Sequence, residues 1–426
     1  MTRLRARRAA GRRWPGAAPN HRPPHVLLVV ENVSLARDHR LRKQAAALLG
    51  DGYRVSVICR SDPGNDALVG VRVHQYRAPA DGDSKLGFLR EYGYSLAMAG
   101  WLTARTFVTD RFDAVQISGT PDLYFIIAAP LRLLGTRLVL DQRDLSPELY
   151  ELRYGRRDAP YRMLRRLERA SYRAADHVIT VNHSLEITAY VRGGLPAGTV
   201  SVVGNGPVLA HVGRRPARPE LKHGRRYLCC WLGVMGPQDQ VELALRAVAQ
   251  LVHERGRTDC HFAFVGDGES RGPAQQRADE LGISEFVSFP GWLPEDEAFS
   301  YLSTADLGLE PNLEEIVSPV KGMEYMAFGL PFVAFDLAET RALARDAAAY
   351  AEPADVQRFA ELVDELLDDA DRRAAMGRAG RQRIEDEFAW DHQQPAYLDV
   401  YRSLFDLPRT SEPAVRRVEH STKVVA

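Results

Sequence analysis

The stretch Ser318–Gly329, which reads SPVKGMEYMAFG, holds residue types that could bind a phosphorylated ligand. Ser318 is a suitable N-cap and Pro319 a suitable first helical residue, so the segment predicts a helix with a defined start. A helix N-terminus presents unpaired N–H groups and partial positive charge, which favour phosphate. Lys321 lies in the first turn, and Glu324 follows on the same face, where its carboxylate could accept hydrogen bonds from ribose hydroxyls. The alternative interpretation is a solvent-facing helix with an ordinary Lys–Glu pair.

Two glycine-rich turns could bring backbone N–H groups close to the same phosphates. GVMGPQD at 233–239 and GDG at 266–268 each follow an apolar run and precede a helical pattern. Glycine lets the chain turn tightly and lets a ligand approach the backbone. Neither turn has the G-x-G-x-x-G spacing, so the sequence gives no support for a nicotinamide-dependent dehydrogenase.

Short β-branched runs alternate with helical patterns on both sides of a Pro- and Gly-rich break, which predicts mainly parallel sheets covered by helices. We therefore predict an α/β protein with two Rossmann-like, doubly wound domains that face a cleft. In such sheets, ligands bind at the carboxyl ends of the strands. The predicted divisions are a basic disordered tail at 1–24, an N-terminal domain at 25–208, a linker at 209–225, a C-terminal domain at 226–388, a last helix at 389–408 and a disordered tail at 409–426.

Composition excludes several classes of protein. A chain of 426 residues is long enough for two domains, and its formal net charge of zero gives no indication of nucleic-acid binding. No histidine spacing indicates a metal site, so we predict no metal ligands. The four cysteines also match no zinc or redox spacing, which indicates core thiols in a reducing compartment; they are Cys59, Cys229, Cys230 and Cys260.

No run of residues is apolar enough for a transmembrane helix, and residues 1–24, with seven arginines and no acids, lack the apolar core of a secretion signal. We therefore expect a cytoplasmic protein, with peripheral contact at the inner membrane face left open. The arginine-rich start is either a disordered tail or a basic arm that contacts anionic lipid. The segment Ser84–Thr109, rich in aromatic and aliphatic residues, either packs on a core or lies on a membrane.

Six segments occur together in a characteristic order. They are VENVSLARDHRLRKQAAAL at 30–48, DQRDLSPELYELRYG at 141–155, GVMGPQD at 233–239, GDG at 266–268, VSFPGW at 287–292 and SPVKGMEYMAFGLPFVAFDLAETR at 318–341. Over residues 25–405 this ordered set resembles the GT-B glycosyltransferases, particularly the retaining family 4. The resemblance implies transfer of a sugar from a nucleotide-diphosphate sugar to a polysaccharide, glycolipid or other acceptor, with retention and without a metal ion or a separate cofactor.

The resemblance also assigns roles to individual residues. Glu324 matches the second acid of the family's E-x7-E motif, which holds the donor ribose, and Lys321 lies at the pyrophosphate-facing end of the same helix. Asp144 would face the acceptor, with Arg143 beside it. The last helix, whose helical pattern covers Pro395–Leu404, would cross back to the N-terminal domain. The other implied acceptor-side residues are Asp38 and Arg40, and the other implied donor-binding residues are Gly233, Met235, Gly236, Gly266, Asp267, Gly268, Trp292, Leu293, Ser318 and Pro319.

The sequence departs from the family pattern at several positions. Ile316 stands where E-x7-E has its first acid, and Val234 and Asp239 stand where many relatives carry Arg and Lys. Arg143 replaces a frequent His, and Gly204 replaces a frequent Arg. Two alternatives to an active glycosyltransferase therefore stay open. One is a GT-B sugar-nucleotide epimerase, and the other is a catalytically weakened homologue that binds nucleotide sugars.

Overall fold

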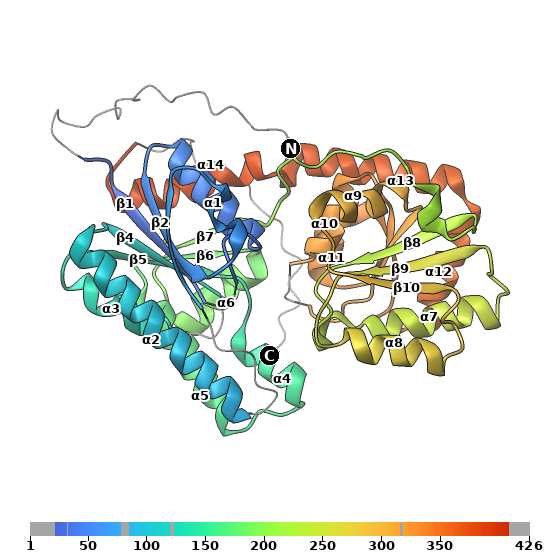
Figure 1. Ribbon diagram of the computed structural model, residues 1–426, viewed down its shortest axis with the longest axis horizontal. Coiled ribbons are helices and arrows are strands. Elements are labelled where there is room, and N and C mark those ends of the chain that lie inside the picture. The colour runs from blue at the N-terminus through green and yellow to red at the C-terminus, as the bar shows by residue number, and fades with distance from the viewer. Residues whose placement is uncertain (1–21, 32, 78–84, 120–122, 316–317, 409–426) are drawn as a thin grey trace.

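Two separate parallel sheets organise the chain, as the computed structural model shows (Figure 1). It describes residues 22–31, 33–77, 85–119, 123–315 and 318–408. Ile316, the predicted tail at 409–426 and all but the last three residues of the predicted tail at 1–24 lie outside the described residues.

The first sheet has seven parallel strands in the order β3-β2-β1-β4-β5-β6-β7. Its strands are β1 (His25–Val30), β2 (Arg54–Arg60), β3 (Val71–Tyr76), β4 (Ala114–Ser118), β5 (Arg137–Gln142), β6 (His177–Thr180) and β7 (Val200–Val202). The connecting helices are α1 (His39–Gly50), η1 (Pro63–Ala67), α2 (Lys85–Thr109), α3 (Phe125–Arg132), α4 (Ser146–Tyr154), α5 (Ala159–Ala174) and α6 (His183–Gly193).

The second sheet has six parallel strands in the order β10-β9-β8-β11-β12-β13. Its strands are β8 (Tyr227–Leu232), β9 (Cys260–Val265), β10 (Val287–Gly291), β11 (Leu307–Glu310), β12 (Phe332–Phe335) and β13 (Ala348–Ala351). Its helices are η2 (Pro219–Lys222), η3 (Pro237–Asp239), α7 (Val241–His253), α8 (Arg271–Glu280), α9 (Glu295–Thr304), α10 (Val320–Ala327), α11 (Ala338–Ala344), η4 (Arg345–Ala347), α12 (Val356–Asp368) and α13 (Ala370–Arg383), followed by the π-helical η5 (Ile384–Phe388) and by α14 (Trp390–Leu404).

Each sheet is buried on both faces, because successive strand residues point alternately into two apolar cores. In the first sheet, one core contains residues of α1 and α14, and the other contains residues of α2 and α3. In the second, α7 and α12 cover one face and α10 covers the other. Four free cysteines lie buried within these cores. The prediction of two doubly wound parallel-sheet domains is therefore confirmed.

In both sheets the strand order reverses at the first strand of the domain, β1 in one and β8 in the other. In the first sheet β1 lies between β2 and β4, and in the second β8 lies between β9 and β11. The loops after these neighbouring strands therefore separate to opposite faces, which is where doubly wound sheets bind ligands. The glycine turn that starts at Gly233 and the segment before α10 follow β8 and β11, so they occupy such a position.

The last helix returns to the first sheet although it follows the second in sequence. Trp390, Tyr397 and Tyr401 of α14 are buried in the core that contains α1. The hydroxyls of Tyr397 and Tyr401 both donate to Oε1 of Gln116, at 3.0 and 2.7 Å. The chain therefore crosses between the domains twice, once after β7 and once before α14.

The structure differs from the sequence expectation at three places. The pattern did not reveal β13 and α11, because both lie in an alanine-rich segment with few β-branched residues and no clear periodicity. The helix predicted to start at Pro395 begins at Trp390 instead, so the proline lies inside the helix. Ser318 is not the N-cap of α10, because Pro319 has a ψ of 71° and the helix starts one residue later. Among the described residues, no helix is both long and apolar enough to cross a bilayer.

Candidate functional site

Lys321 lies at the centre of the polar residues of the C-terminal domain. Its Nζ donates to Oδ1 of Asp239 at 2.6 Å and lies 3.8 Å from Oε1 of Glu310. It also lies 5.2 Å from the centre of the Trp231 ring. Burial lowers the pKa of Lys321, but the carboxylates of Glu310 and Asp239 outweigh burial and hold that pKa above its ordinary value. The ammonium group is therefore charged and positioned at the first turn of α10.

Glu310 was not predicted as a site residue, although it is the last residue of an otherwise apolar strand. Its side chain is 2% exposed, and its Oε1 has no hydrogen-bond partner among the described residues. Burial raises the pKa of Glu310, and Asp239 adds to this effect while Lys321 opposes it. An acid at the carboxyl end of β11, beside the reversal of strand order, is the sequence signal that could have identified it.

The two glycine turns pack against each other. A Cβ on Gly266 would lie 1.8 Å from the carbonyl oxygen of Gly233, and one on Gly268 would lie 2.5 Å from that of Met235. Met235 is fully buried, and its N–H donates to the carbonyl of Asp267 at 2.9 Å. These glycines are thus required for backbone packing between the turns. Their predicted contacts with a donor stay a prediction.

The Lys321 side chain crosses the first turn, since a Cβ on Gly233 would meet its Cε at 2.8 Å. The N–H of Gly236 donates to Oδ2 of Asp239 at 3.1 Å, so the same carboxylate fixes the turn and holds Lys321. Asp239, noted as a departure from the family pattern, therefore has a defined structural task. Val234 has no such contact and is 71% exposed.

Glu324 lies one helical turn after Lys321 and faces the N-terminal domain. Burial raises the pKa of Glu324 to about 7, while Lys321 and Lys43 act in the opposite direction. Lys43 belongs to α1, and burial together with Arg40 lowers its pKa to about 8, although Glu324 raises it. A base of one domain and an acid of the other thus influence each other's charge.

Lys43 was not predicted as a site residue. Its Nζ donates to the carbonyls of Asn205 and Gly206 at 3.0 and 2.6 Å, and it lies 5.3 Å from the centre of the Trp390 ring. It therefore joins α1 to both crossings between the domains. Its place three residues after Arg40, on the same helical face, is the sequence signal that could have indicated a shared environment.

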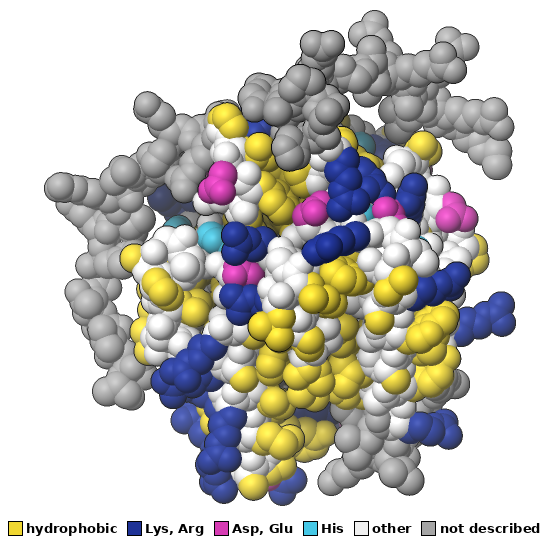
Figure 2. Space-filling model, turned by 90° about the vertical axis from the view of Figure 1, so that its left-hand side faces the viewer, with side chains coloured by type: hydrophobic (Ala, Val, Ile, Leu, Met, Phe, Trp, Pro, Cys, Tyr) yellow, Lys and Arg dark blue, Asp and Glu magenta, His cyan; other side chains and the backbone are white. Residues whose placement is uncertain are grey.

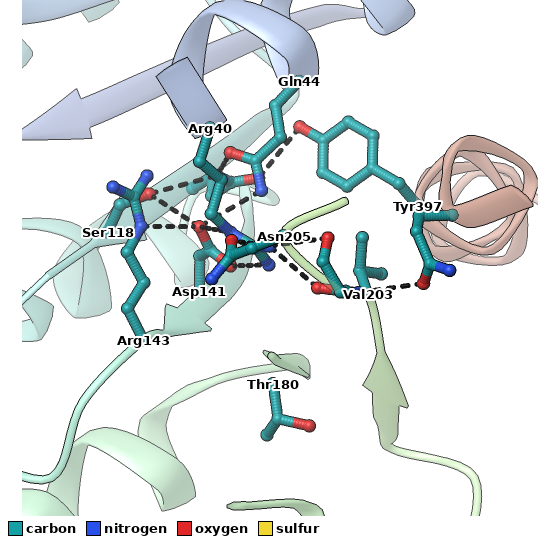
Figure 3. Close-up of polar contacts among 12 residues, drawn as sticks. Arg40, Gln44, Ser118, Asp141, Arg143, Thr180, Val203, Asn205 and Tyr397 are labelled. Atoms are coloured by element: carbon teal, nitrogen blue, oxygen red, sulfur yellow. Dashed lines mark hydrogen bonds and ion pairs between the residues drawn. The ribbon is translucent and has the colours of Figure 1, made fainter. Parts of the chain in front are cut away.

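On the other side, a buried carboxylate organises the residues predicted to face the acceptor (Figure 3). Asp141 is fully buried at the end of β5, and its oxygens accept from Nε and Nη2 of Arg40 at 3.1 and 2.8 Å. Nε of Arg143 and Nε2 of Gln44 each donate to Oδ2 of Asp141 at 3.1 Å. Burial alone would raise the pKa of Asp141, but the two guanidinium groups outweigh burial and hold that pKa below its usual range.

Arg40 also ties this network to the segment that follows β7. Its Nη1 donates to the carbonyl of Val203 and to Oδ1 of Asn205, both at 2.8 Å, and its side chain is 6% exposed. Arg143 donates to Oδ2 of Asp38 at 2.6 Å, and Asp38 also caps α1 by accepting from the N–H of Leu41. The structure therefore brings Asp38, Arg40 and Arg143 together as an internal ion network. Their predicted roles toward the acceptor stay predictions.

Asp144 differs from these three residues. Its half-buried carboxylate has no hydrogen bond within the described part of the chain, and burial raises its pKa while Arg143 opposes the shift. Unlike the carboxylate of Asp38, that of Asp144 is therefore free to bind a ligand hydroxyl.

Trp292 and Leu293 follow β10 at the boundary between the domains. The Trp292 side chain is 62% exposed, and the guanidinium of Arg37 from the N-terminal domain lies 5.5 Å from its ring centre. Leu293 is partly buried against the core that contains α10. Ion pairs join Arg42 to Glu295 at 3.8 Å and Arg153 to Glu269 at 2.9 Å across the same boundary. Among the described residues, no group of His, Cys, Asp or Glu is arranged to hold a metal ion.

The Asp141 network makes a prediction for stability. Asp141→Asn should lower the free energy of unfolding by ~3–5 kcal/mol, because it leaves the buried Arg40 without its carboxylate and removes one of the two carboxylates that bind Arg143. The folded-state pKa of Asp141 is depressed, so its contribution is present above the unfolded pKa and is lost as pH falls through the folded one. Urea denaturation should therefore show a gap between variant and wild type that narrows below about pH 4. Asp296→Asn, at an ion pair whose acid is 86% exposed, is the control. A loss for Asp141→Asn no larger than for this control would contradict the prediction.

Lys321→Met removes the ammonium between two carboxylates and nearly conserves side-chain volume. We expect a loss of ~3 kcal/mol at pH 8 and a smaller loss at pH 5. Lys321 opposes the effect of burial on the pKa of Glu310, so without Lys321 the folded-state pKa of Glu310 rises further and the folded variant loses stability as pH increases above the unfolded pKa of that group. The control is Lys222→Met, which breaks a half-buried ion pair with Asp306 elsewhere in the domain. Equal losses for Lys321→Met at both pH values would show that the carboxylates do not depend on Lys321.

Two family models match the chain, one on each sheet. Residues 38–206 match the "glycosyl transferase 4-like domain", and residues 226–369 match "glycosyl transferases group 1". The chain is 32% identical over 168 residues to MMP alpha-(1->4)-mannosyltransferase of Mycolicibacterium hassiacum, a match that covers 39% of this chain and 40% of the relative. It is 31% identical to 2-deoxystreptamine glucosyltransferase of Streptomyces kanamyceticus, over 39% of this chain and 43% of the relative. The matches thus span about two fifths of these relatives' own length.

Solved structures match over most of the chain. Sucrose-phosphate synthase of Thermosynechococcus elongatus superposes with a TM-score of 0.73 at 18% identity, over 90% of this chain and 100% of that one. HepE of Anabaena, in complex with UDP and glucose, gives a TM-score of 0.71 at 16% identity with the same coverage. At these identities the structural likeness shows the fold alone, and the two family models show the family. The chain belongs to the group 1 glycosyltransferases and has their two-domain GT-B fold.

Proposed function

We propose that this protein transfers a sugar from a nucleotide-diphosphate sugar to a glycan or a lipid-linked acceptor, with retention of configuration and without a metal ion or a resident cofactor. The observation that carries the proposal is the position of Lys321 and Glu324. Both lie on the first turns of α10, beside the glycine turn that follows β8, where the strand order reverses. Family membership supports the same activity, and HepE is described in complex with UDP-glucose.

In this proposal, the bond between the anomeric carbon and the diphosphate oxygen breaks, and an acceptor oxygen bonds to that carbon on the same face. The acceptor proton passes to the departing diphosphate. Negative charge grows on the diphosphate as the bond breaks, so a charged Lys321 and the α10 N-terminus stabilise the transition state more than the ground state. Asp144 would orient the acceptor hydroxyl, and peripheral contact with a membrane would bring a lipid-linked acceptor within reach.

Asp239 and Glu310 provide acidic partners for Lys321 when no ligand is bound. Without a donor, the ammonium pairs with Asp239 at 2.6 Å. A diphosphate carries more charge than one carboxylate and would therefore compete for the same ammonium. This arrangement keeps the cation in position, and it gives Asp239 a role at a place where many relatives have a basic residue.

Nucleotide binding tests the donor site. We expect one of UDP, GDP and ADP, or its sugar conjugate, to raise the melting temperature of the wild type, because a ligand that binds only the folded state stabilises it. Glu324→Ala should abolish this shift. The control is Glu280→Ala, which breaks the exposed Arg277–Glu280 pair on α8, also spaced three residues apart. If no nucleotide raises the melting temperature of the wild type, the chain is not a nucleotide-sugar enzyme.

The pKa of Glu324 adds a pH dependence to that binding. A carboxylate that accepts hydrogen bonds from ribose must be ionised, and burial raises its pKa to about 7. Between pH 6 and pH 8 the ionised fraction increases roughly tenfold, so affinity for the stabilising nucleotide should increase by up to that factor. In Glu324→Gln, the affinity should keep only the pH dependence that comes from the nucleotide phosphates and from other side chains. Identical pH profiles for the two proteins in calorimetric titrations would exclude Glu324 as a ribose ligand.

Lys321→Ala tests the transition-state role. We expect release of nucleoside diphosphate from the stabilising nucleotide sugar to slow by about 10²–10³-fold, the usual effect of losing one group that stabilises developing charge. The melting temperature of each variant shows whether it is folded under assay conditions. Lys222→Ala should retain the wild-type rate. An unchanged rate for folded Lys321→Ala would remove Lys321 from the mechanism.

A further inference from the structure

Helix α2 presents an apolar stripe to solvent on the outer side of the N-terminal domain. Tyr94, Trp101 and Val108 are 40%, 55% and 84% exposed and recur every seven residues. Seven residues are two helical turns, so the three side chains line one face of α2. Ala99 and Leu102, on another face of the helix, are buried in the domain core. The helix is therefore apolar both toward the core and toward solvent.

The neighbouring helix α3 continues this apolar surface. Ile126 is 46% exposed, and Leu133 and Leu134, just after the helix, are 91% and 54% exposed. α3 packs against both α2 and α5, and all three helices lie on the side of the first sheet turned away from the second domain (Figure 1). Several large apolar side chains thus stand close together on one outer face, which monomeric proteins usually avoid.

The exposed charges on these helices are all positive. Figure 2 shows this side of the molecule, with apolar side chains gathered over its centre and lower part and with Lys and Arg around them. The acids of the described part of the three helices, Glu91 and Glu168, are buried and paired with Arg60 and Arg192. The exposed cations are Arg90, Arg105, Arg132, Arg162, Arg166, Arg169 and Arg173.

Two further features indicate which partner this face fits. The guanidinium of Arg105 lies 5.4 Å from the centre of the Trp101 ring, so an aromatic side chain and a cation occupy the same position on the stripe. In addition, the arginine-rich start of the chain joins the fold beside the end of α2, where Arg22 donates to the carbonyl oxygen of Arg111 and to Asp113. Residues 1–21, which precede Arg22 in the sequence, contain six arginines and no acids.

We propose that the face formed by α2, α3 and α5, here called the outer basic face, docks on an anionic lipid surface. Aromatic and aliphatic side chains enter the boundary between headgroups and acyl chains, and arginines pair with lipid phosphates while their stems stay in the apolar region. A protein partner would need an acidic apolar surface of matching shape, whereas a bilayer supplies both properties over any area. This assignment rests on exposed side chains alone and does not depend on the sugar-transfer reaction.

Vesicle binding tests the proposal. The full chain should co-sediment with vesicles of phosphatidylglycerol and phosphatidylcholine, at least tenfold more strongly than with phosphatidylcholine alone, and binding should weaken in high salt. The double variant Trp101→Ser, Val108→Ser should bind the anionic vesicles at least fivefold more weakly. The matched control is Val69→Ser, because Val69 is 83% exposed but follows Leu68, which packs on the opposite side of the sheet. Circular dichroism verifies that each variant is folded.

Quenching by brominated lipid adds a readout of insertion. Tryptophan emission should be quenched when the wild type binds anionic vesicles, and Trp101→Phe, which conserves an aromatic ring, should lose most of this quenching while it still binds. Failure of the full chain to bind anionic vesicles would overturn the proposal and favour a protein partner for this face. Equal binding by the double variant would overturn it as well, because binding would then reside in the arginines of residues 1–21.

Discussion

The structure of the N-terminal domain depends on one buried charge, the carboxylate of Asp141. A fully buried carboxylate is costly unless it is paired and hydrogen-bonded, and here two arginines and Gln44 satisfy it. Because Arg40 also binds the segment after β7, this single charge fixes α1 and the chain that leaves the first sheet. Lys43, on the same helix, then donates to carbonyls of that segment and contacts Trp390 of the returning helix. The position of one domain relative to the other therefore starts from this ion network.

The C-terminal domain also has a charged group surrounded by groups of opposite charge, but in the proposed function this arrangement serves ligand binding. Lys321 is also a charge held between acids, but the acids outnumber it, and Oε1 of Glu310 has no hydrogen-bond partner among the described residues. Asp141 is fully compensated and so serves structure. The Lys321 cluster, in contrast, sets one ammonium group against two acids, and burial raises the pKa of Glu310 while Lys321 opposes that shift. A complete network stabilises a fold, whereas an incomplete one at a strand end is where ligand binding can gain free energy.

The sequence predicts the fold well because alternating apolar runs and helical patterns depend on local periodicity. Strands β1, β3, β8, β9, β11 and β12 each coincide with a short apolar or β-branched run of the sequence. The alanine-rich β13 and α11 lack that signal, and the start of α14 depends on packing against α1, which no local pattern encodes. Lys321 and Glu324 were found because they lie on one short helix. Asp141, Glu310 and Lys43 were not, because their importance arises from partners distant in sequence. For the same reason, the sequence indicated Arg40 and Arg143 as candidate ligand-binding residues and did not indicate that both bind the carboxylate of Asp141.

The interaction between Lys43 and Glu324 links these two halves. Each group is buried, and burial moves their pKa values toward each other, to about 8 and about 7. Their charges therefore change within the physiological pH range, and each charged group favours ionisation of the other. Separation of α1 from α10 would rehydrate both groups and return their pKa values toward the ordinary ones, so the protonation of Glu324 is coupled to the distance between the domains. A ligand that bridges the domains and requires an ionised Glu324 must then supply the free energy of ionising this acid where burial raises its pKa, so domain arrangement and ligand binding become parts of one equilibrium.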